Sequence, residues 1–296
     1  MTDTAATLPR MRSWLFAPGD SDKKMGKAIA SDADIALLDL EDSVTPENKA
    51  SARQQVAAAI AGAPDRSRVW VRVNPLSGEW TEADLDAVVA ANPGGIFLPK
   101  SEGGHDVERL DTMLSAREAA AGLEVGAIKV AALVTETAAA MFTTGTYDGA
   151  PRLVAMSWGA EDLSSELGAR QQRGPDSEYT HVYEMARSLC LLGAVKAGVA
   201  PIETVHPEFR DLDKLASRAR SVRAQGFRGM LAIHPAQVAP INEAFTPSAE
   251  ELDHARAVIQ AFADNPGAGA VSMDGNMLDR PHLALAQRLL AEVGQV

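Results

Sequence analysis

Short apolar segments alternate with longer segments of helical character eight times along this chain of 296 residues. Most of the apolar segments are continuous runs rather than strict alternations of apolar and polar residues, which is typical of parallel strands covered on both faces. Eight strand–helix repeats favour an α/β fold closed into a (β/α)8 TIM barrel over an open sheet. The predicted strands are Ser13–Ala17, Ile35–Leu40, Val69–Val73, Gly95–Leu98, Val130–Val134, Leu153–Ser157, Ala200–Thr204 and Met230–Ile233.

The pattern changes after the eighth predicted strand. A capping-box pattern at Ser248 opens a helix, a strand–turn–strand pattern surrounds Asp274-Gly275, and a final helix is expected near Pro281. The sequence therefore predicts a catalytic barrel over residues 10–244, followed by a C-terminal helix–hairpin–helix appendage over residues 245–296.

Polar side chains gather where the predicted strands end, and in a barrel these ends form one rim that carries the active site. A single carboxylate at such a position is as often a helix cap as a functional group. Acidic residues at three strand ends are harder to explain as caps, because their repulsion destabilises the fold unless a cation or a basic group lies among them. The rim segments are Asp39-Leu40-Glu41-Asp42, Arg72-Val73-Asn74-Pro75, Pro99-Lys100, Glu136, Glu161-Asp162 and His234-Pro235.

Glu136 and Asp162 are the candidate metal ligands, because the adjacent fifth and sixth strands would bring both carboxylates to the same part of the rim. Magnesium suits this pair, since it keeps several waters and takes one or two carboxylates together with ligand oxygens. Zinc is disfavoured, because the six histidines are scattered and no His or Cys cluster has the usual spacing of a zinc site. The sequence also lacks a phosphate-binding P-loop and a G-x-S-x-G nucleophile elbow.

The formal charge of −12 argues against a nucleic-acid-binding protein and against binding to anionic membranes, because both need a basic surface. The negative net charge does not exclude an anionic small ligand that a few local cations bind. No apolar run approaches the roughly 20 residues of a membrane span, and the N-terminal segment has no apolar signal core. The chain has a single cysteine, Cys190, so no internal disulfide can form. This residue is expected in the core. A cytoplasmic location is expected.

Seven motifs at these positions follow one another in the order found in a known family. They are Arg12-Ser13-Trp14-Leu15-Phe16-Ala17-Pro18-Gly19-Asp20, Asp34-Ile35-Ala36-Leu37-Leu38-Asp39-Leu40-Glu41-Asp42, Val71-Arg72-Val73-Asn74, Leu98-Pro99-Lys100, Thr135-Glu136-Thr137, Gly159-Ala160-Glu161-Asp162-Leu163 and Ile233-His234-Pro235-Ala236-Gln237. With these motifs the chain resembles the HpcH/HpaI aldolase–citrate lyase β-subunit superfamily, most closely its citrate lyase β-subunit-like (CitE-like) and malyl-CoA lyase-like branch. The resemblance extends from about Arg12 to the final predicted helix.

The resemblance implies a role for each matching rim residue. Glu136 and Asp162 match the magnesium ligands of the family. Arg72 matches the arginine that binds substrate and stabilises negative charge on a carbonyl or enolate. Three further residues would support these groups by orienting waters and the arginine, as metal sites generally require. They are Asp39, Glu41 and Lys100.

The resemblance also implies residues for phosphate binding and for proton transfer. Arg12, with Lys49 or Arg53, matches cations expected at the coenzyme A phosphates, with exposed solubilising charge as an equal alternative. Asp279 matches an aspartate that reaches the active site of a neighbouring subunit as acid or base, and its alternative role is an N-cap for the helix after Pro281. A shared site of this kind implies a homo-oligomer, a trimer or a dimer of trimers.

The implied activity is cleavage of a carbon–carbon bond in a 3-hydroxyacyl-CoA of the malyl-CoA, citramalyl-CoA or citryl-CoA type, which releases a keto acid or aldehyde and an acyl-CoA. Magnesium would act as Lewis acid, Arg72 would stabilise the enolate, and Asp279 would transfer the proton. Three alternatives stay open. They are a malyl-CoA thioesterase or malate synthase-like activity, a citryl-CoA lyase β subunit of a citrate lyase complex, and a non-catalytic binding subunit.

Overall fold

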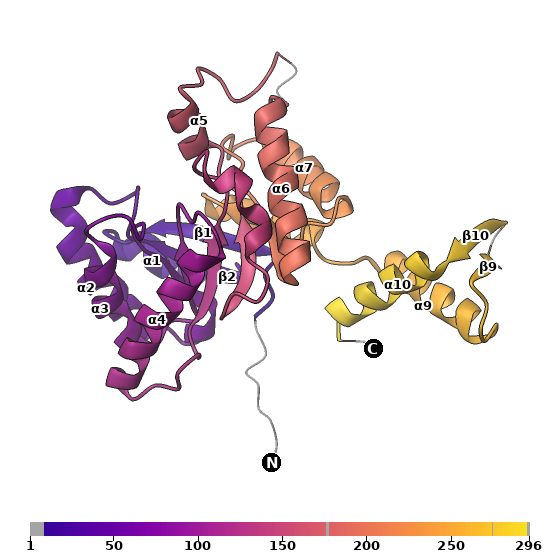
Figure 1. The fold of residues 1–296 in the computed structure, drawn as a ribbon, viewed down its shortest axis with the longest axis horizontal. Coiled ribbons are helices and arrows are strands. Elements are labelled where there is room, and N and C mark those ends of the chain that lie inside the picture. The colour runs from indigo at the N-terminus through magenta and orange to yellow at the C-terminus, as the bar shows by residue number, and fades with distance from the viewer. Residues whose placement is uncertain (1–8, 176–177, 274, 295–296) are drawn as a thin grey trace. The chain divides into compact units, whose positions relative to one another are not determined.

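The computed structural model describes residues 9–175, 178–273 and 275–294, and it confirms the predicted barrel. Eight parallel strands close in sequence order, flanked by helices (Figure 1), and each strand lies within one residue of its predicted bounds. The strands are β1 (Ser13–Pro18), β2 (Ile35–Asp39), β3 (Val69–Arg72), β4 (Gly95–Leu98), β5 (Lys129–Leu133), β6 (Leu153–Ser157), β7 (Ala200–Glu203) and β8 (Gly229–Ala232).

The barrel helices are α1 (Asp22–Ile29), α2 (Lys49–Gly62), α3 (Thr81–Val88), α4 (Gly104–Ala121), α5 (Glu161–Leu167), α6 (His181–Ala197), α7 (Leu212–Ala224) and α8 (Val238–Ala244). Every strand is followed by at least one of them except β5, whose link to β6 contains only two 3-10 turns, Ala140–Phe142 and Thr144–Thr146. Strands β5 and β6 are paired, with Leu133 opposite Ser157, so the loops after them leave the barrel side by side. Among the described residues, no helix combines the length and the hydropathy that a membrane crossing requires.

Apolar side chains pack on both sides of the strands. Inside the barrel a buried cluster contains Trp14, Trp70 and Phe97, and the ring centroids of the two tryptophans lie 5.0 Å apart. A larger cluster lies between the strands and the helices and includes Cys190. This cysteine is fully buried, as predicted, and burial raises the pKa of its thiol. The barrel interior is thus a packed core rather than a pore, which leaves the carboxyl ends of the strands for a ligand.

The chain divides into two compact units, Met1–Phe245 and Thr246–Val296, and the division lies next to the predicted boundary. The second unit has the predicted helix–hairpin–helix order and an apolar cluster of its own. Its capping box is also confirmed, because the hydroxyl of Ser248 accepts from the backbone N–H of Glu251 at 3.1 Å. Its elements are α9 (Ala249–Ala263), the antiparallel pair β9 (Ala270–Met273) and β10 (Asn276–Asp279), and α10 (Arg280–Glu292).

Candidate active site

The carboxyl ends of the strands surround a cavity of about 630 Å³. The structure brings the main predicted site residues together there: Asp39 at the end of β2, Arg72 at the end of β3, Glu136 after β5 and Asp162 at the start of α5. Apolar groups complete much of the wall. They include Phe16, Leu133, Trp158, Leu231 and Ile233.

Arg72 is held by two carboxylates that belong to the segment at the end of β2. Its Nε and Nη2 donate to the two carboxylate oxygens of Asp39, each at 2.7 Å, and its Nη1 lies 3.0 Å from Oε2 of Glu41 as an ion pair. Burial alone would raise the pKa of Asp39, but the charge and hydrogen bonds of Arg72 outweigh it and hold that pKa below its ordinary value. Bidentate pairing fixes the plane of a guanidinium, so Arg72 meets the cavity in one orientation.

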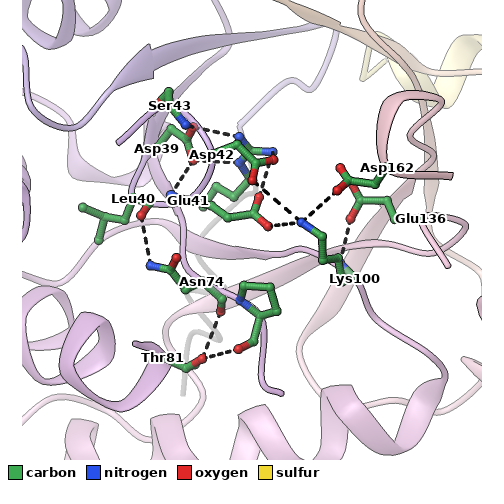
Figure 2. A network of polar contacts seen from close by, with 12 residues as sticks. Asp39, Leu40, Glu41, Asp42, Ser43, Asn74, Thr81, Lys100, Glu136 and Asp162 are labelled. Carbon is green, nitrogen blue, oxygen red and sulfur yellow. Dashed lines mark hydrogen bonds and ion pairs between the residues drawn. The ribbon is translucent and has the colours of Figure 1, made fainter. Parts of the chain in front are cut away.

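Lys100, just after β4, ties the rim carboxylates to one another (Figure 2). Its Nζ lies 2.5 Å from Oε1 of Glu41 and 3.0 Å from Oδ1 of Asp162. Its backbone N–H donates to Oε2 of Glu136 at 2.6 Å. Lys100 has a φ of +51°, a left-handed conformation that costs a non-glycine residue about 1–2 kcal/mol. This conformation directs its backbone N–H at one predicted metal ligand and its side chain at the other.

Glu136 and Asp162 can accommodate a cation between protein and ligand. Glu136 is buried, and this burial, together with the nearby carboxylates of Glu41 and Asp162, raises its pKa to about 8. The side chain of Asp162 is 29% exposed and lies beside Glu136 in Figure 2. A buried carboxylate among like charges fits a site that a cation completes. Within the described ranges no three His, Cys, Asp or Glu residues form a protein-only cage, and a two-carboxylate site suits magnesium.

Residues 12–235, most of the chain, match the sequence profile of HpcH/HpaI aldolase/citrate lyase. The chain belongs to this family. A citrate lyase subunit beta-like protein from Mycobacterium tuberculosis is 34% identical over 283 residues, which are 95% of each chain. A (3S)-malyl-CoA thioesterase from Cereibacter sphaeroides is 34% identical over 285 residues, 95% of this chain and 94% of the relative. These names describe different reactions, so membership of the aldolase/citrate lyase family does not by itself choose one of them.

This chain has a fold similar to that of CitE from Mycobacterium tuberculosis, whose structure was solved in complex with magnesium, acetoacetate and coenzyme A. The TM-score is 0.79, with 33% sequence identity over 96% of this chain and 98% of that chain. The similarity therefore extends over nearly the whole length of both proteins.

Gly159, in the segment between β6 and α5, leaves room for Glu136 in this aldolase/citrate lyase site. A Cβ added at Gly159 would lie 2.9 Å from Oε1 of Glu136 and 3.0 Å from its Cγ, closer than side chains normally pack. The backbone of Gly159 lies so close to Glu136 that a side chain at this position would displace the Glu136 carboxylate.

Gly159→Ala should weaken magnesium binding about tenfold, because a site must hold its ligands to within roughly 0.5 Å. Calorimetric titration with magnesium measures the effect. Gly145→Ala is the matched control, since a Cβ at Gly145 would meet nothing within 4 Å. Unchanged affinity in Gly159→Ala would show that Glu136 does not bind the ion.

Two of the cations predicted to bind phosphate are engaged inside the protein. Lys49 is buried in α2, where its Nζ donates to two backbone oxygens at the end of β2 and to Oδ1 of Asn74, at 2.6–2.8 Å. Arg53, one turn further along α2, forms an ion pair with the buried Asp84 at 2.7 Å. Both side chains join α2 to the segments that follow β2 and β3, and neither can reach a ligand without breaking these bonds. In this structure both cations serve internal hydrogen bonds and ion pairs, and their phosphate-binding role stays a prediction.

Arg12 lies at the opposite end of the barrel from the cavity. It directly precedes β1, whose carboxyl end borders the cavity, and it pairs with Asp34, which precedes β2. The distance from Nη2 of Arg12 to Oδ1 of Asp34 is 2.8 Å. Ligands bind at the carboxyl ends of the strands in barrels of this kind, and the phosphate-binding role of Arg12 stays a prediction.

Asp279 ends β10 in the C-terminal unit and occupies the N-cap position of α10. Its Oδ1 lies 2.6 Å from Nδ1 of His282, and its side chain is 47% exposed. Asp279 therefore serves as the N-cap of α10, which is the alternative role that the sequence allowed. An N-cap carboxylate with this exposure can still meet a ligand, so the proton-transfer role of Asp279 stays a prediction.

A buried ion pair that the sequence did not predict lies behind the rim. Glu203, the last residue of β7, is fully buried and accepts hydrogen bonds from Nε1 of Trp158 at 3.1 Å and from Nη2 of Arg218 at 2.9 Å. Because Trp158 lines the cavity, Glu203 positions part of the cavity wall. A charged residue at the end of an apolar strand was the signal that could have revealed it.

Glu203→Gln should lower the free energy of unfolding by about 3 kcal/mol, because it leaves the guanidinium of Arg218, only 12% exposed, without its charged partner. Urea denaturation measures this change. Glu108→Gln on the exposed surface of α4 is the control and should change stability by less than about 0.5 kcal/mol. A loss below about 1 kcal/mol in Glu203→Gln would contradict a stabilising buried pair.

Proposed function

We propose that the protein is a magnesium-dependent carbon–carbon lyase that acts on a 3-hydroxyacyl-CoA thioester of the malyl-CoA, citramalyl-CoA or citryl-CoA type. This proposal rests on one observation: the carboxylates of Glu136 and Asp162 and the guanidinium of Arg72 line the same cavity. The similarity to a structure that holds magnesium, acetoacetate and coenzyme A supports the same ligand classes here. The products would be a keto acid or aldehyde and an acyl-CoA.

Each group has a separate task in the proposed reaction. Glu136 and Asp162 would hold magnesium, which when bound supplies a Lewis acid for the oxygens of the keto-acid half. As the bond between C2 and C3 breaks, its electron pair moves to the carbon beside the thioester, and the hydroxyl proton passes to water. Arg72 stabilises the negative charge that develops on the thioester oxygen. Asp39 and Glu41 keep its guanidinium in place for this task.

Asp279 is the group that we assign to protonate the carbon beside the thioester, which completes the acyl-CoA product. Its carboxyl group is accessible in the C-terminal unit, as proton transfer to a ligand requires. In the proposed homo-oligomer, a trimer or a dimer of trimers, Asp279 would complete the site of a neighbouring copy. Activity would then depend on assembly.

Magnesium affinity should rise with pH up to about 8. Below that value Glu136 carries a proton that the cation must displace, because burial and neighbouring carboxylates raise its pKa to about 8. The association constant should therefore grow by up to about tenfold per pH unit on the acidic side and level off above. Calorimetric titrations at several pH values check this, and a constant affinity across the range would contradict it.

A malyl-CoA thioesterase is the second candidate, because a relative named for that reaction is 34% identical over 95% of this chain. Hydrolysis would use Arg72 at the same thioester oxygen but would need a water directed at the thioester carbon. Turnover of malyl-CoA, citramalyl-CoA and citryl-CoA, measured with magnesium and after its removal by a chelator, tests both candidates. Activity that persists without any divalent cation, or no activity with any of the three thioesters, would overturn the proposed lyase.

A further inference from the structure

A histidine lies beside the proposed proton donor in the C-terminal unit. Nδ1 of His282, in the first turn of α10, is 2.6 Å from Oδ1 of Asp279, at the end of β10. Both side chains are about half exposed. A contact this short between a ring nitrogen and a carboxyl oxygen requires a proton between them, because two lone pairs would repel each other. One proton is therefore shared at the carboxyl group proposed for proton transfer.

Helix capping alone does not explain a histidine at this position. His282 is the third residue of α10, where the usual partner of an N-cap residue is Glu or Gln. Its Nδ1 lies 3.2 Å from the backbone nitrogen of Asp279, the group that a capping side chain accepts from. Glu or Gln could accept this bond equally well, and Glu would bring a second negative charge to Asp279. Histidine differs from Glu because it can donate a proton to the carboxyl group.

The start of α10 fixes the two side chains relative to each other. Pro281 lies between them in the first helical turn, where its ring restricts the backbone to a helical φ. The contact of Nδ1 with Oδ1 of Asp279 is much shorter than its contact with the backbone nitrogen, 2.6 Å against 3.2 Å. The shorter contact decides the tautomer of His282. Its ring carries the proton on Nδ1 and donates it to Oδ1.

We propose that His282 is a positioning residue for Asp279, an inference that rests on the proposed function. Its Nδ1–H holds Oδ1, so that Oδ2 of Asp279 is the oxygen that exchanges a proton with the substrate. In cleavage, the electron pair left on the carbon beside the thioester takes the proton from Oδ2. The hydrogen bond from His282 stabilises the carboxylate that remains, and solvent then returns a proton to Oδ2. This bond is stronger to the carboxylate than to the neutral acid, so it favours the transition state of proton transfer.

Two variants at position 282 separate this role from capping. Glu and Gln both keep a usual capping residue there, but only Gln retains an N–H donor for Asp279. In turnover of malyl-CoA, citramalyl-CoA or citryl-CoA with magnesium, H282E should lower kcat about tenfold or more and leave KM within about twofold. The kcat of H282E should also fall more in heavy water than that of the wild type, because proton transfer then limits turnover. H282Q should keep kcat within about threefold.

H254E is the matched control, since His254 is an exposed residue of α9 in the same unit, and its kcat should stay within about twofold of the wild type. Urea denaturation verifies that all three variants are folded. Wild-type kcat in H282E would overturn the positioning role and leave His282 as a cap. An equal loss in H282Q or in H254E would overturn it as well, because the loss would not depend on the donor.

A wild type that turns over none of these thioesters would overturn the proposed reaction, and nitrogen NMR of the histidine rings in the full chain would still test the contact. A proton on Nδ1 of His282 that moves to Nε2 in D279A would support the shared proton. A ring without a proton on Nδ1 in the wild type would overturn it. The positioning role and the proposed reaction can therefore fail separately.

Discussion

Glu136→Gln and Asp162→Asn should each lower turnover of the proposed substrate by about 10³-fold or more, with the fold intact. Each change removes one of the two carboxylates at the proposed metal site, and a bound metal contributes several kcal/mol to stabilising the transition state. Glu136→Gln also removes an ionisable group that is buried beside Glu41 and Asp162, so the free energy of unfolding should not fall. Steady-state kinetics and urea denaturation measure the two effects.

Glu166→Gln is the matched control for these substitutions. Glu166 is an exposed residue of α5, four positions after Asp162, and its side chain accepts a hydrogen bond from the backbone N–H of Ala138 at 2.9 Å. Glutamine keeps that acceptor, so turnover should stay within about twofold of the wild type. Wild-type turnover in Asp162→Asn would remove the basis for a metal site at this rim.

Arg72→Lys should lower kcat/KM by about 10²-fold although the positive charge is kept. Lysine cannot form the two parallel bonds that Arg72 makes with Asp39 while also reaching Glu41 and the ligand. The loss should therefore be largest in kcat, because the charge that Arg72 stabilises develops in the transition state.

Arg117→Lys provides the comparison for Arg72→Lys. Arg117 in α4 also bridges two carboxylates, those of Glu82 and Asp86, but both of these are largely exposed. Its replacement should leave kcat and KM unchanged within about twofold. If both arginine variants lose activity equally, the effect comes from stability rather than from charge stabilisation at the cavity.

The barrel could be predicted from the sequence because its strands are buried on both faces. Segments such as Ile35–Leu40 and Val130–Val134 are continuous apolar runs, and the strands occur at these places within one residue. The link between β5 and β6 is less regular, with two 3-10 turns in place of a helix. Local sequence carries little information about such a link, because tertiary packing decides it.

The rim residues could be predicted for a related reason. A side chain that follows a strand in a barrel must lie at one edge, so the positions of Asp39, Arg72 and Glu136 in the sequence already place them together. The direction of a long side chain is not determined in this way. Lys49 and Arg53 have the charge for phosphate binding, but both turn inward to buried partners.

Glu203 and Gly159 show the converse case. The sequence does not predict that Glu203 pairs with Trp158 or that Gly159 packs against Glu136, because the partners lie far away in the sequence. Contacts of this kind require the folded structure.

The most direct test of the proposed function is the identity of the products formed from malyl-CoA and citramalyl-CoA in the presence of magnesium. Keto acid, acetyl-CoA and free thiol should be followed in the same reaction. The proposed lyase should give keto acid and acetyl-CoA in equal amounts, with no release of thiol. Free thiol without keto acid would contradict the lyase and identify thioester hydrolysis instead.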